Sequence, residues 1–120
     1  MNTKFIAEIG SNHNGKIERV FELINMAKQI GCWGVKLQAF KADHLWQKPV
    51  IGGEDIDGSR WAKAKQRELP MEWLPAIHEY ARLKDIKIGY SVFHQDLVSA
   101  VSGWSDFLKI ASYEISNINL

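Results

Sequence analysis

The chain has 120 residues, of which 46% are hydrophobic and 24% are charged, a composition typical of one soluble globular domain. Its 15 basic and 14 acidic residues leave a formal net charge of +1, so no long-range field attracts nucleic acid or an anionic membrane surface. Apolar runs are far shorter than the ~20 residues of a membrane-spanning helix, and the single cysteine allows no internal disulfide. We therefore expect a cytoplasmic protein without a nucleic-acid or membrane partner, in which any anion site is local.

The first third of the chain predicts two strands with a helix between them. Residues 4–9 form an apolar segment with strand character, and the polar loop SNHNG follows it. Residues 16–30 repeat apolar side chains at helical spacing, and Gly31 stands where a glycine commonly ends a helix. Residues 34–40 alternate strictly between apolar and polar side chains, which is typical of a strand.

Residues 41–70 form a long polar connection, too irregular for a core element and too long for an ordinary turn between a strand and a helix. Connections of this kind usually cover a site. The basic residues Lys63, Lys65 and Arg67 alternate with other side chains, and we interpret them as a solvated face. The acidic segment GEDIDGS lacks the spacing of a calcium loop and predicts a turn.

The second half of the chain predicts further helices and strands in alternation. A helix is expected over residues 70–83, with Pro75 in its first turn. A third strand over 86–93 is followed by a short helix capped by Asp96, and a fourth strand covers 107–111. Such alternation predicts an α/β fold of parallel β/α units.

Six polar residues lie within the expected strands or at their carboxyl ends, where the active sites of parallel barrels form: Glu8, Lys36, Gln38, Lys109, Ser112 and Glu114. Taken singly, each charge is equally well explained by a structural ion pair, such as Glu8 with Lys36 or Lys109 with Glu114. These residues converge on one rim of the sheet, formed by the carboxyl ends of the strands. This convergence favours a functional site, because a purely structural core would use apolar residues there. Two lysines and a serine hydroxyl supply the charge and the donors that a phosphate plus a carboxylate require.

Three segments resemble, in order and spacing, the motifs of the sialic acid synthase family: EIGSNHNG at 8–15, VKLQAF at 35–40 and KIASYEISN at 109–117. The segment PMEWLPAIHEYARLKDIKIGYSVF resembles the family's second helix and third strand. The resemblance covers nearly the whole chain. It implies that residues 1–120 are one domain, the N-terminal half of a catalytic TIM (β/α)8 barrel with its first four β/α units, truncated after the fourth strand.

The resemblance implies a transferase of carbohydrate biosynthesis, an N-acetylneuraminate (sialic acid) synthase. Such an enzyme condenses phosphoenolpyruvate with an N-acetylhexosamine, usually N-acetylmannosamine, and gives a nine-carbon sialic acid and phosphate. By matching motifs, Lys36, Lys109 and Ser112 would hold phosphoenolpyruvate, and Gln38 and Glu114 would hold the sugar. Glu8 would lie near the reacting carbon, so Glu8 and Glu114 are the candidate catalytic residues. Further candidates in the same motifs are Asn12, His13, Ser91 and Asn117, of which His13 is expected to order its loop.

The family also implies a divalent metal ion, Mn²⁺ or Mg²⁺, that polarises the sugar aldehyde. Its two histidine ligands belong to the second half of the barrel, so we expect no metal ligand in this chain and no activity from the isolated 120 residues. The chain departs from the family in YSVFH, where Ser91 keeps a hydroxyl but Val92 and His94 replace proline and aspartate. Tyr113 stands where many members have glycine, and it either narrows the sugar pocket or packs against the next helix.

Other interpretations stay open. A non-catalytic half-barrel module for binding or assembly would retain the same phosphoenolpyruvate half site, and another barrel that uses phosphoenolpyruvate would differ in its sugar. The EW of PMEWLP is also similar to the pseudaminic and legionaminic branches. Because half a barrel leaves unpaired edges on its first and last strands, we expect a homo-oligomer, a marginally stable chain or a fragment of a longer one.

Overall fold

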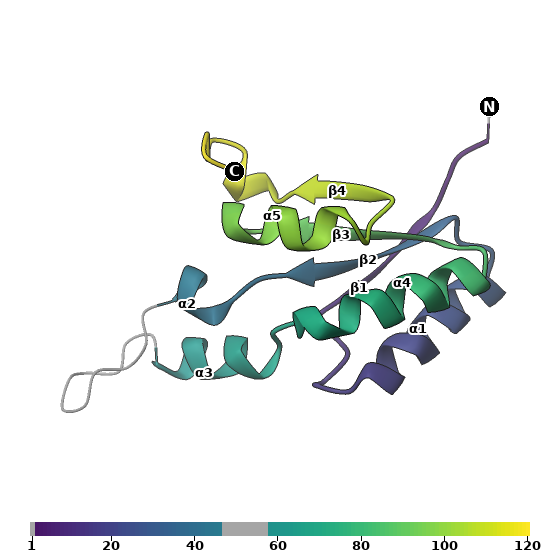
Figure 1. Ribbon diagram of the computed structural model, residues 1–120, viewed down its shortest axis with the longest axis horizontal. Helices are drawn as coiled ribbons and strands as arrows, with labels where there is room; N and C mark the ends of the chain where they lie inside the picture. Colours follow the sequence, from purple (N-terminus) through teal and green to yellow (C-terminus); the bar gives the residue numbers. More distant parts are fainter. Residues whose placement is uncertain (1, 47–57) are drawn as a thin grey trace.

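The computed structural model describes residues 2–46 and 58–120, and a parallel sheet of four strands forms the centre of this part of the chain (Figure 1). The strands lie side by side in chain order: β1 (Ile6–Gly10), β2 (Gly34–Ala39), β3 (Lys87–Val92) and β4 (Phe107–Ile110). The main helical elements are α1 (Ile17–Gln29), the 3-10 helix η1 (Met71–Trp73) that leads into α4 (Leu74–Leu83), α5 (Gln95–Ser102), and a 3-10 helix after β4, η2 (Ser112–Glu114). The predicted α/β class and the order of its parallel β/α units are confirmed.

The ends of the elements follow the expected signals except at one cap. Gly31 has a φ of +84° after α1, a left-handed conformation that glycine adopts without steric cost. Pro75 lies in the first turn of α4, as predicted. The prediction of Asp96 as the cap of α5 was wrong, because His94 is the N-cap and its ring Nδ1 accepts the Asp96 amide N–H at 3.2 Å. An imidazole nitrogen therefore satisfies the free amide that a carboxylate or hydroxyl usually satisfies.

The connection after β2 contains two helices, α2 (Ala42–Leu45) and α3 (Gly58–Gln66), although we expected an irregular loop. Both helices contribute to a second, smaller apolar cluster at the ends of the strands, formed by Phe40, Ala42, Ala64, Phe93 and Ala111. The prediction failed because α3 buries the small side chain of Ala64 and presents no long apolar stripe. Residues 47–57, which contain most of the GEDIDGS segment, lie outside the described residues.

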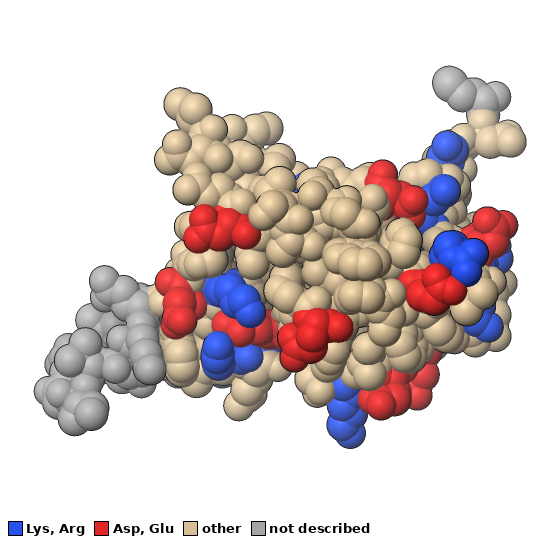
Figure 2. All heavy atoms as spheres, in the orientation of Figure 1, with Lys and Arg blue, Asp and Glu red and all other residues tan. Residues whose placement is uncertain are grey.

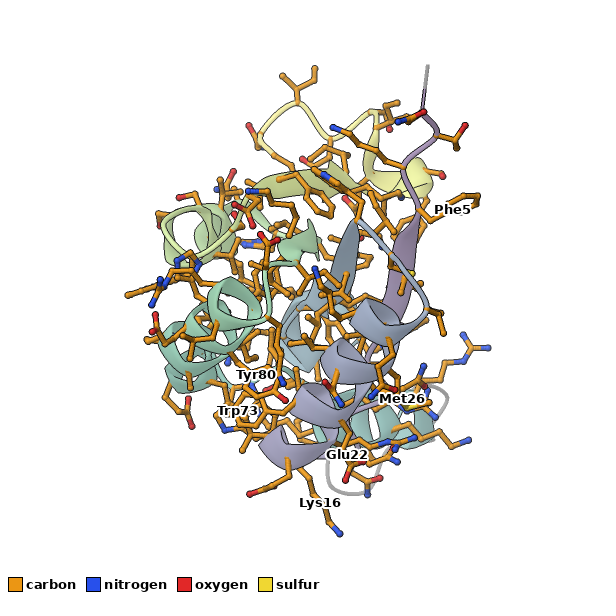
Figure 3. All side chains as sticks on the ribbon, turned by 90° about the vertical axis from the view of Figure 1, so that its right-hand side faces the viewer. Phe5, Lys16, Glu22, Met26, Trp73 and Tyr80 are labelled. Atoms are coloured by element: carbon orange, nitrogen blue, oxygen red, sulfur yellow. The ribbon has the colours of Figure 1, made fainter. Side chains whose placement is uncertain are left out.

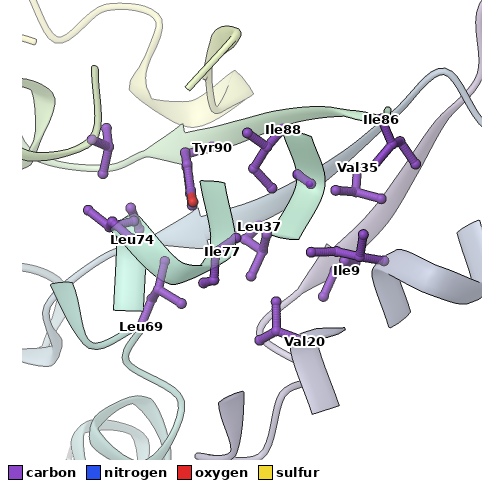
Figure 4. Packing of buried hydrophobic residues seen from close by; sticks show 14 of the residues in the cluster. Ile9, Val20, Val35, Leu37, Leu69, Leu74, Ile77, Ile86, Ile88 and Tyr90 are labelled. Carbon is purple, nitrogen blue, oxygen red and sulfur yellow. The ribbon is translucent and has the colours of Figure 1, made fainter. Parts of the chain in front are cut away.

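The main core lies between one face of the sheet and the helices α1, α4 and α5. Val35, Leu37 and Ala39 of β2 are fully buried, which confirms the apolar face predicted from their alternation. Figure 4 shows this packing, with Leu37, Tyr90 and other strand residues next to side chains of α4. In Figure 3 the labelled side chains of Trp73 and Tyr80 lie beside α1.

The opposite face of the sheet carries the polar residues of the strands. Lys36 of β2 is in register with Glu8 of β1 and with Gly89 of β3. One step nearer the carboxyl ends, the next level of this face contains Gln38, Ser91 and Lys109. Parallel neighbours in register point to the same side of a sheet, so the strands bring the predicted polar residues together.

The edge strands of the sheet are β1 and β4. Large apolar side chains are exposed at both edges, Phe5 and Ile6 near β1 and Leu108 and Ile110 in β4, and Figure 3 shows Phe5 pointing away from the body of the protein. Self-association through these edges stays a prediction. None of the helices in the described part of the chain has both the length and the apolar character needed to cross a membrane.

Candidate active site

A cavity of about 600 Å³ lies at the carboxyl ends of the strands, within the ~300–1,000 Å³ range of small-molecule sites. Six of the predicted site residues line it, namely Glu8, Lys36, Gln38, Ser91, Lys109 and Ser112. These residues come from all four strands or from the turn directly after β4. The convergence on one rim that the sequence predicted is therefore present.

Lys36 is held at the centre of this rim by two neighbours. Its ammonium forms an ion pair with Glu8 and donates a hydrogen bond to the Ser91 hydroxyl at 2.8 Å. The Lys36 side chain is 12% exposed and Ser91 is 3% exposed, so both are largely withdrawn from water. An ammonium group has three donors, and one is left for a ligand after these two contacts.

The remaining lining groups extend the rim on both sides of Lys36. Gly10 has a φ of +60°, and a Cβ there would lie 3.4 Å from Glu8 Oε1 and 3.9 Å from Gln38 Nε2, so the backbone of β1 runs close beside the two polar side chains. Lys109 is exposed, and its ammonium makes a 3.4 Å contact with the Ile110 carbonyl. That long contact leaves the Lys109 ammonium with donors for a ligand in the cavity.

Four other predicted residues do not line the cavity in the described part of the chain: Asn12, His13, Glu114 and Asn117. Glu114 lies in η2 and accepts a 3.0 Å hydrogen bond from the Asn117 side-chain amide. Asn12 is exposed in the loop after β1. His13 is fully buried beside that loop. This geometry does not test the predicted roles of Glu114, Asn12 and Asn117.

His13 orders the loop after β1 by a hydrogen bond to the backbone. Its Nδ1 accepts the Gly15 N–H at 3.1 Å, and its ring meets the Trp73 ring edge-on with centroids 5.5 Å apart. The buried Nε2 has no hydrogen-bond partner at hydrogen-bond geometry within the described part of the chain. Burial lowers the pKa of His13, and the Arg67 backbone carbonyl opposes that shift. A neutral imidazole with Nδ1 as acceptor is consistent with both observations.

Aromatic side chains form part of the cavity wall, and Tyr113 is among them. Phe40, Trp46, Phe93 and Tyr113 line the cavity, and the Phe93 and Tyr113 rings have centroids 5.9 Å apart. Burial, and secondarily the negative charge of Glu114, raises the pKa of Tyr113, so its hydroxyl stays protonated at neutral pH. Tyr113 thus borders the cavity, and the choice between its two predicted roles stays a prediction.

The sequence analysis missed the contribution of α3. Arg60, Lys63 and Arg67 line the cavity from the side of α3. Lys63, Lys65 and Arg67 are all exposed, as the interpretation of a solvated face predicts. Lys65 pairs with Glu68 at 3.0 Å, and Lys63 and Arg67 also line the open cavity. Their spacing of four residues would have placed them on one helix face, had a helix been predicted there.

The charge of the cavity is local, as predicted. Five cationic side chains and one carboxylate, that of Glu8, line it within the described residues. Elsewhere the basic and acidic side chains intermingle on the face shown in Figure 2, in agreement with a net charge of +1. The cavity thus attracts anions at short range, whereas the nearly neutral molecule as a whole does not attract them from a distance.

The residues that line the cavity do not form a set of metal ligands. Glu8 is the only carboxylate among them, no histidine lines the cavity in the described residues, and an ammonium group already neutralises Glu8. A second group, His44, His94 and Asp96, has ligand atoms within 4.8 Å of one another. However, Nδ1 of His94 already accepts the Asp96 amide, and the two imidazole rings stack face to face at 3.8 Å instead of pointing at a common centre.

Comparison with known proteins places the chain and its fold in a family. The chain is 35% identical to the spore coat polysaccharide biosynthesis protein SpsE of Bacillus subtilis over 96% of the chain and 32% of SpsE. It is 33% identical to the N,N'-diacetyllegionaminic acid synthase of Legionella pneumophila over 94% of the chain and 34% of that protein. The chain spans about a third of the length of these curated relatives.

A solved structure shows the same fold as this chain. The crystal structure of N-acetylneuraminic acid (sialic acid) synthetase from Leptospira borgpetersenii, in complex with citrate, superimposes with a TM-score of 0.80 at 25% identity. The superposition covers 98% of this chain and 39% of that chain, so the four β/α units correspond to the N-terminal part of a TIM barrel. Residues 23–120 match the NeuB family, and the chain belongs to this family.

Proposed function

We propose that the chain carries the phosphoenolpyruvate-binding part of a sialic acid synthase-like enzyme. The observation that supports it most directly is the Lys36 ammonium, held between Glu8 and Ser91 in a cavity that Lys109 and Ser112 also line. Ammonium and hydroxyl donors around one space suit a small anion with a phosphate and a carboxylate. The relatives named above as synthases support the same reaction class.

In the proposed reaction, C3 of phosphoenolpyruvate forms a bond to the aldehyde carbon of an open-chain N-acetylhexosamine, and the aldehyde oxygen takes up a proton. Water adds at C2 of the former phosphoenolpyruvate, and the bond from C2 to the phosphate oxygen then breaks. The products are a nine-carbon keto acid of the sialic acid type and inorganic phosphate.

The chain's residues contribute positioning and charge to this reaction. Lys36, Lys109 and Ser112 hold phosphoenolpyruvate, and Gln38 and Glu114 are the candidate sugar contacts. Glu8 orients the Lys36 ammonium and is the carboxylate nearest to it. Because the cavity lining does not fit a divalent metal, we route no step through one, and the metal that the family implies would need ligands outside these residues.

Binding of phosphoenolpyruvate to Lys36→Met and Lys65→Met variants tests the proposal. Lys65 is a matched control, since its ammonium pairs with Glu68 on α3. We expect Lys36→Met to weaken binding by about tenfold or more, because a charge-assisted hydrogen bond is lost and the Glu8 carboxylate is freed. Equal affinities of Lys36→Met and wild type, measured by isothermal titration calorimetry, would contradict the proposal.

Phosphate release from phosphoenolpyruvate separates the enzyme from a binding module when it is measured, with N-acetylmannosamine and Mn²⁺, on this chain extended to the length of its curated relatives, because the isolated 120 residues are expected to be inactive in either case. Release that depends on the sugar supports the synthase. Tight binding without release supports the second candidate, a non-catalytic half-barrel that retains the phosphoenolpyruvate half site. That candidate draws its support from a cavity lining that contains no set of metal ligands among the described residues.

A further inference from the structure

An aromatic ring lies on the polar face of the sheet, at the level where the Lys36 side chain begins. Phe107 of β4 is in register with Gly89 of β3, and Gly89 is in register with Lys36 of β2. The three residues therefore share one level of that face. The Phe107 ring covers Gly89 so closely that a Cβ there would overlap it. The ring thus fills the place that a side chain at position 89 would otherwise take.

The same ring reaches β2 beside the base of Lys36. A Cβ at Gly34 would lie 3.5 Å from Cε1 of Phe107, and Gly34 precedes Lys36 by two residues, on the same face of the strand. Trp33 immediately precedes β2 and backs the ring from the side of the amino ends, with the two ring centroids 5.8 Å apart. We call Phe107 and Trp33 the aromatic floor.

The aromatic floor accounts for the direction in which the Lys36 side chain extends. Lys36 starts at the level of Gly89, yet its ammonium donates to the Ser91 hydroxyl at 2.8 Å, one level nearer the carboxyl ends. Because glycine has no Cβ, a lysine stem could lie flat across β3 at this level if the space were empty. The Phe107 ring fills that space, and the stem extends toward Ser91 and the cavity instead.

Phe107 does not line the cavity within the described residues, so any effect that it has on a ligand is indirect. We propose that Phe107 is a positioning residue: its ring, laid over Gly89 and backed by Trp33, keeps the Lys36 ammonium at the level of Ser91 with a donor toward the cavity. The inference rests on the proposed function for the identity of the ligand, phosphoenolpyruvate. Binding groups need packed neighbours that hold them within about 0.5 Å of the productive geometry, and an apolar ring does so without competing for the hydrogen bonds of the ammonium.

Exchange of the Lys36 ammonium hydrogens with water tests the floor without any ligand. NMR of ¹⁵N-labelled lysine side chains follows these hydrogens, and Lys36→Met identifies their signal. Wild type should exchange more slowly at Lys36, which is 12% exposed, than at Lys65, which is 50% exposed. Phe107→Ala should speed exchange at Lys36 several-fold and leave Lys65 unchanged, because the stem can then fall away from Glu8 and Ser91. Phe107→Leu keeps most of the apolar bulk and should stay close to wild type.

A double-mutant cycle in phosphoenolpyruvate affinity shows whether Phe107 acts through Lys36. Isothermal titration calorimetry should give binding about three- to tenfold weaker in Phe107→Ala than in wild type. In the Lys36→Met background the same substitution should change the affinity by less than about twofold, since the group that it positions is absent. Ile88→Val is the matched control: it removes a buried methyl from the opposite face of β3, so it should lower stability and leave the affinity unchanged.

Two results would overturn the inference. One is a wild-type exchange rate of the Lys36 ammonium in Phe107→Ala. The other is an equal loss of affinity from Phe107→Ala with and without Lys36, which is what a merely structural role predicts. If Phe107→Ala does not fold, Phe107→Val replaces it, because valine vacates the space over Gly89 and still suits a strand.

The two measurements separate this inference from the proposed function. If wild type does not bind phosphoenolpyruvate, the proposed function fails, and the exchange rates alone decide whether Phe107 positions Lys36. If phosphoenolpyruvate binds and depends on Lys36 but not on Phe107, the proposed function stands and the positioning role is wrong.

Discussion

The two faces of the sheet are built from alternate residues of the same strands, and they differ in what they do. On the face toward the helices, Val35, Leu37 and Ala39 are fully buried in the main core. On the opposite face, Lys36 and Gln38 are only partly buried and line the cavity. One strand therefore supplies core packing with its odd-numbered residues and lines the cavity with its even-numbered ones. Substitutions of neighbouring residues should separate the two contributions.

The largest contrast is expected at Leu37 and Gln38. Leu37→Ala removes a fully buried side chain and should cost about 2–5 kcal/mol in the free energy of unfolding. Gln38→Ala should change it by less than about 0.5 kcal/mol, since its side chain lies in the cavity. Urea denaturation followed by circular dichroism measures both values. Similar losses for the two variants would show that the cavity face also packs as a core.

A smaller effect is expected at Gly89, where the polar face has its own packed contact. The Phe107 ring lies over Gly89, and a Cβ added at this glycine would overlap the ring. Gly89→Ala should therefore destabilise the fold by about 1–3 kcal/mol, the usual range for overpacking.

A double-mutant cycle with Phe107→Ala checks the physical cause at Gly89. In the Phe107→Ala background the alanine has room, so its cost should fall close to zero. An undiminished cost would mean that the loss comes from the backbone of β3 and not from the Phe107 ring.

The apolar face of the sheet and the polar residues at its carboxyl edge were predictable from the sequence, and the wall that α3 adds to the cavity was not. The alternation over residues 34–40 is a local property, and it identified both sides of β2 correctly. For Lys36 and Glu8 the sequence left an ion pair and a ligand site as alternatives, and the structure contains the pair within a ligand-sized cavity. Lys63 and Arg67 look like any solvated lysine and arginine, because the wall they face is formed by strands distant in sequence. Tertiary placement of α3 is the information that local patterns lack.

The stability of the fold should depend on pH through His13 in the loop after β1. Burial lowers the pKa of His13 below its ordinary value of 6.5, so the unfolded chain binds a proton that the folded protein excludes. Stability is then complete above about pH 6.5 and falls as the pH drops through 6.5 toward the lower pKa of the folded state, by at most about 1.4 kcal/mol per pH unit. Unfolding free energies measured from pH 7.5 to 5 should show this decline.

His13→Gln is the variant that isolates the histidine from other titrating groups. Glutamine cannot take up a proton, and its side-chain oxygen can accept the Gly15 N–H that Nδ1 accepts in wild type. The decline between pH 7 and 5 should become shallower in the variant. An unchanged slope would assign the acid sensitivity to groups other than His13.

The smallest effect on the free energy of unfolding is expected at Tyr90 on the apolar face. Unlike the other substitutions, a change there should not destabilise the fold. Its side chain is fully buried in the main core (Figure 4), and its hydroxyl has no hydrogen-bond partner among the residues that the structure describes. Burial raises the pKa of this hydroxyl, so it stays protonated while its donor and acceptor are unused. Tyr90→Phe removes a desolvated polar atom and keeps the ring, and should leave stability unchanged or raise it by up to about 1 kcal/mol.

Thermal and urea unfolding measure the change, with Tyr80→Phe on α4 as the control for loss of a partly exposed hydroxyl. A clear loss of stability in Tyr90→Phe would mean that the hydroxyl has a partner, and the apolar face would then contain a polar contact that its sequence pattern does not predict.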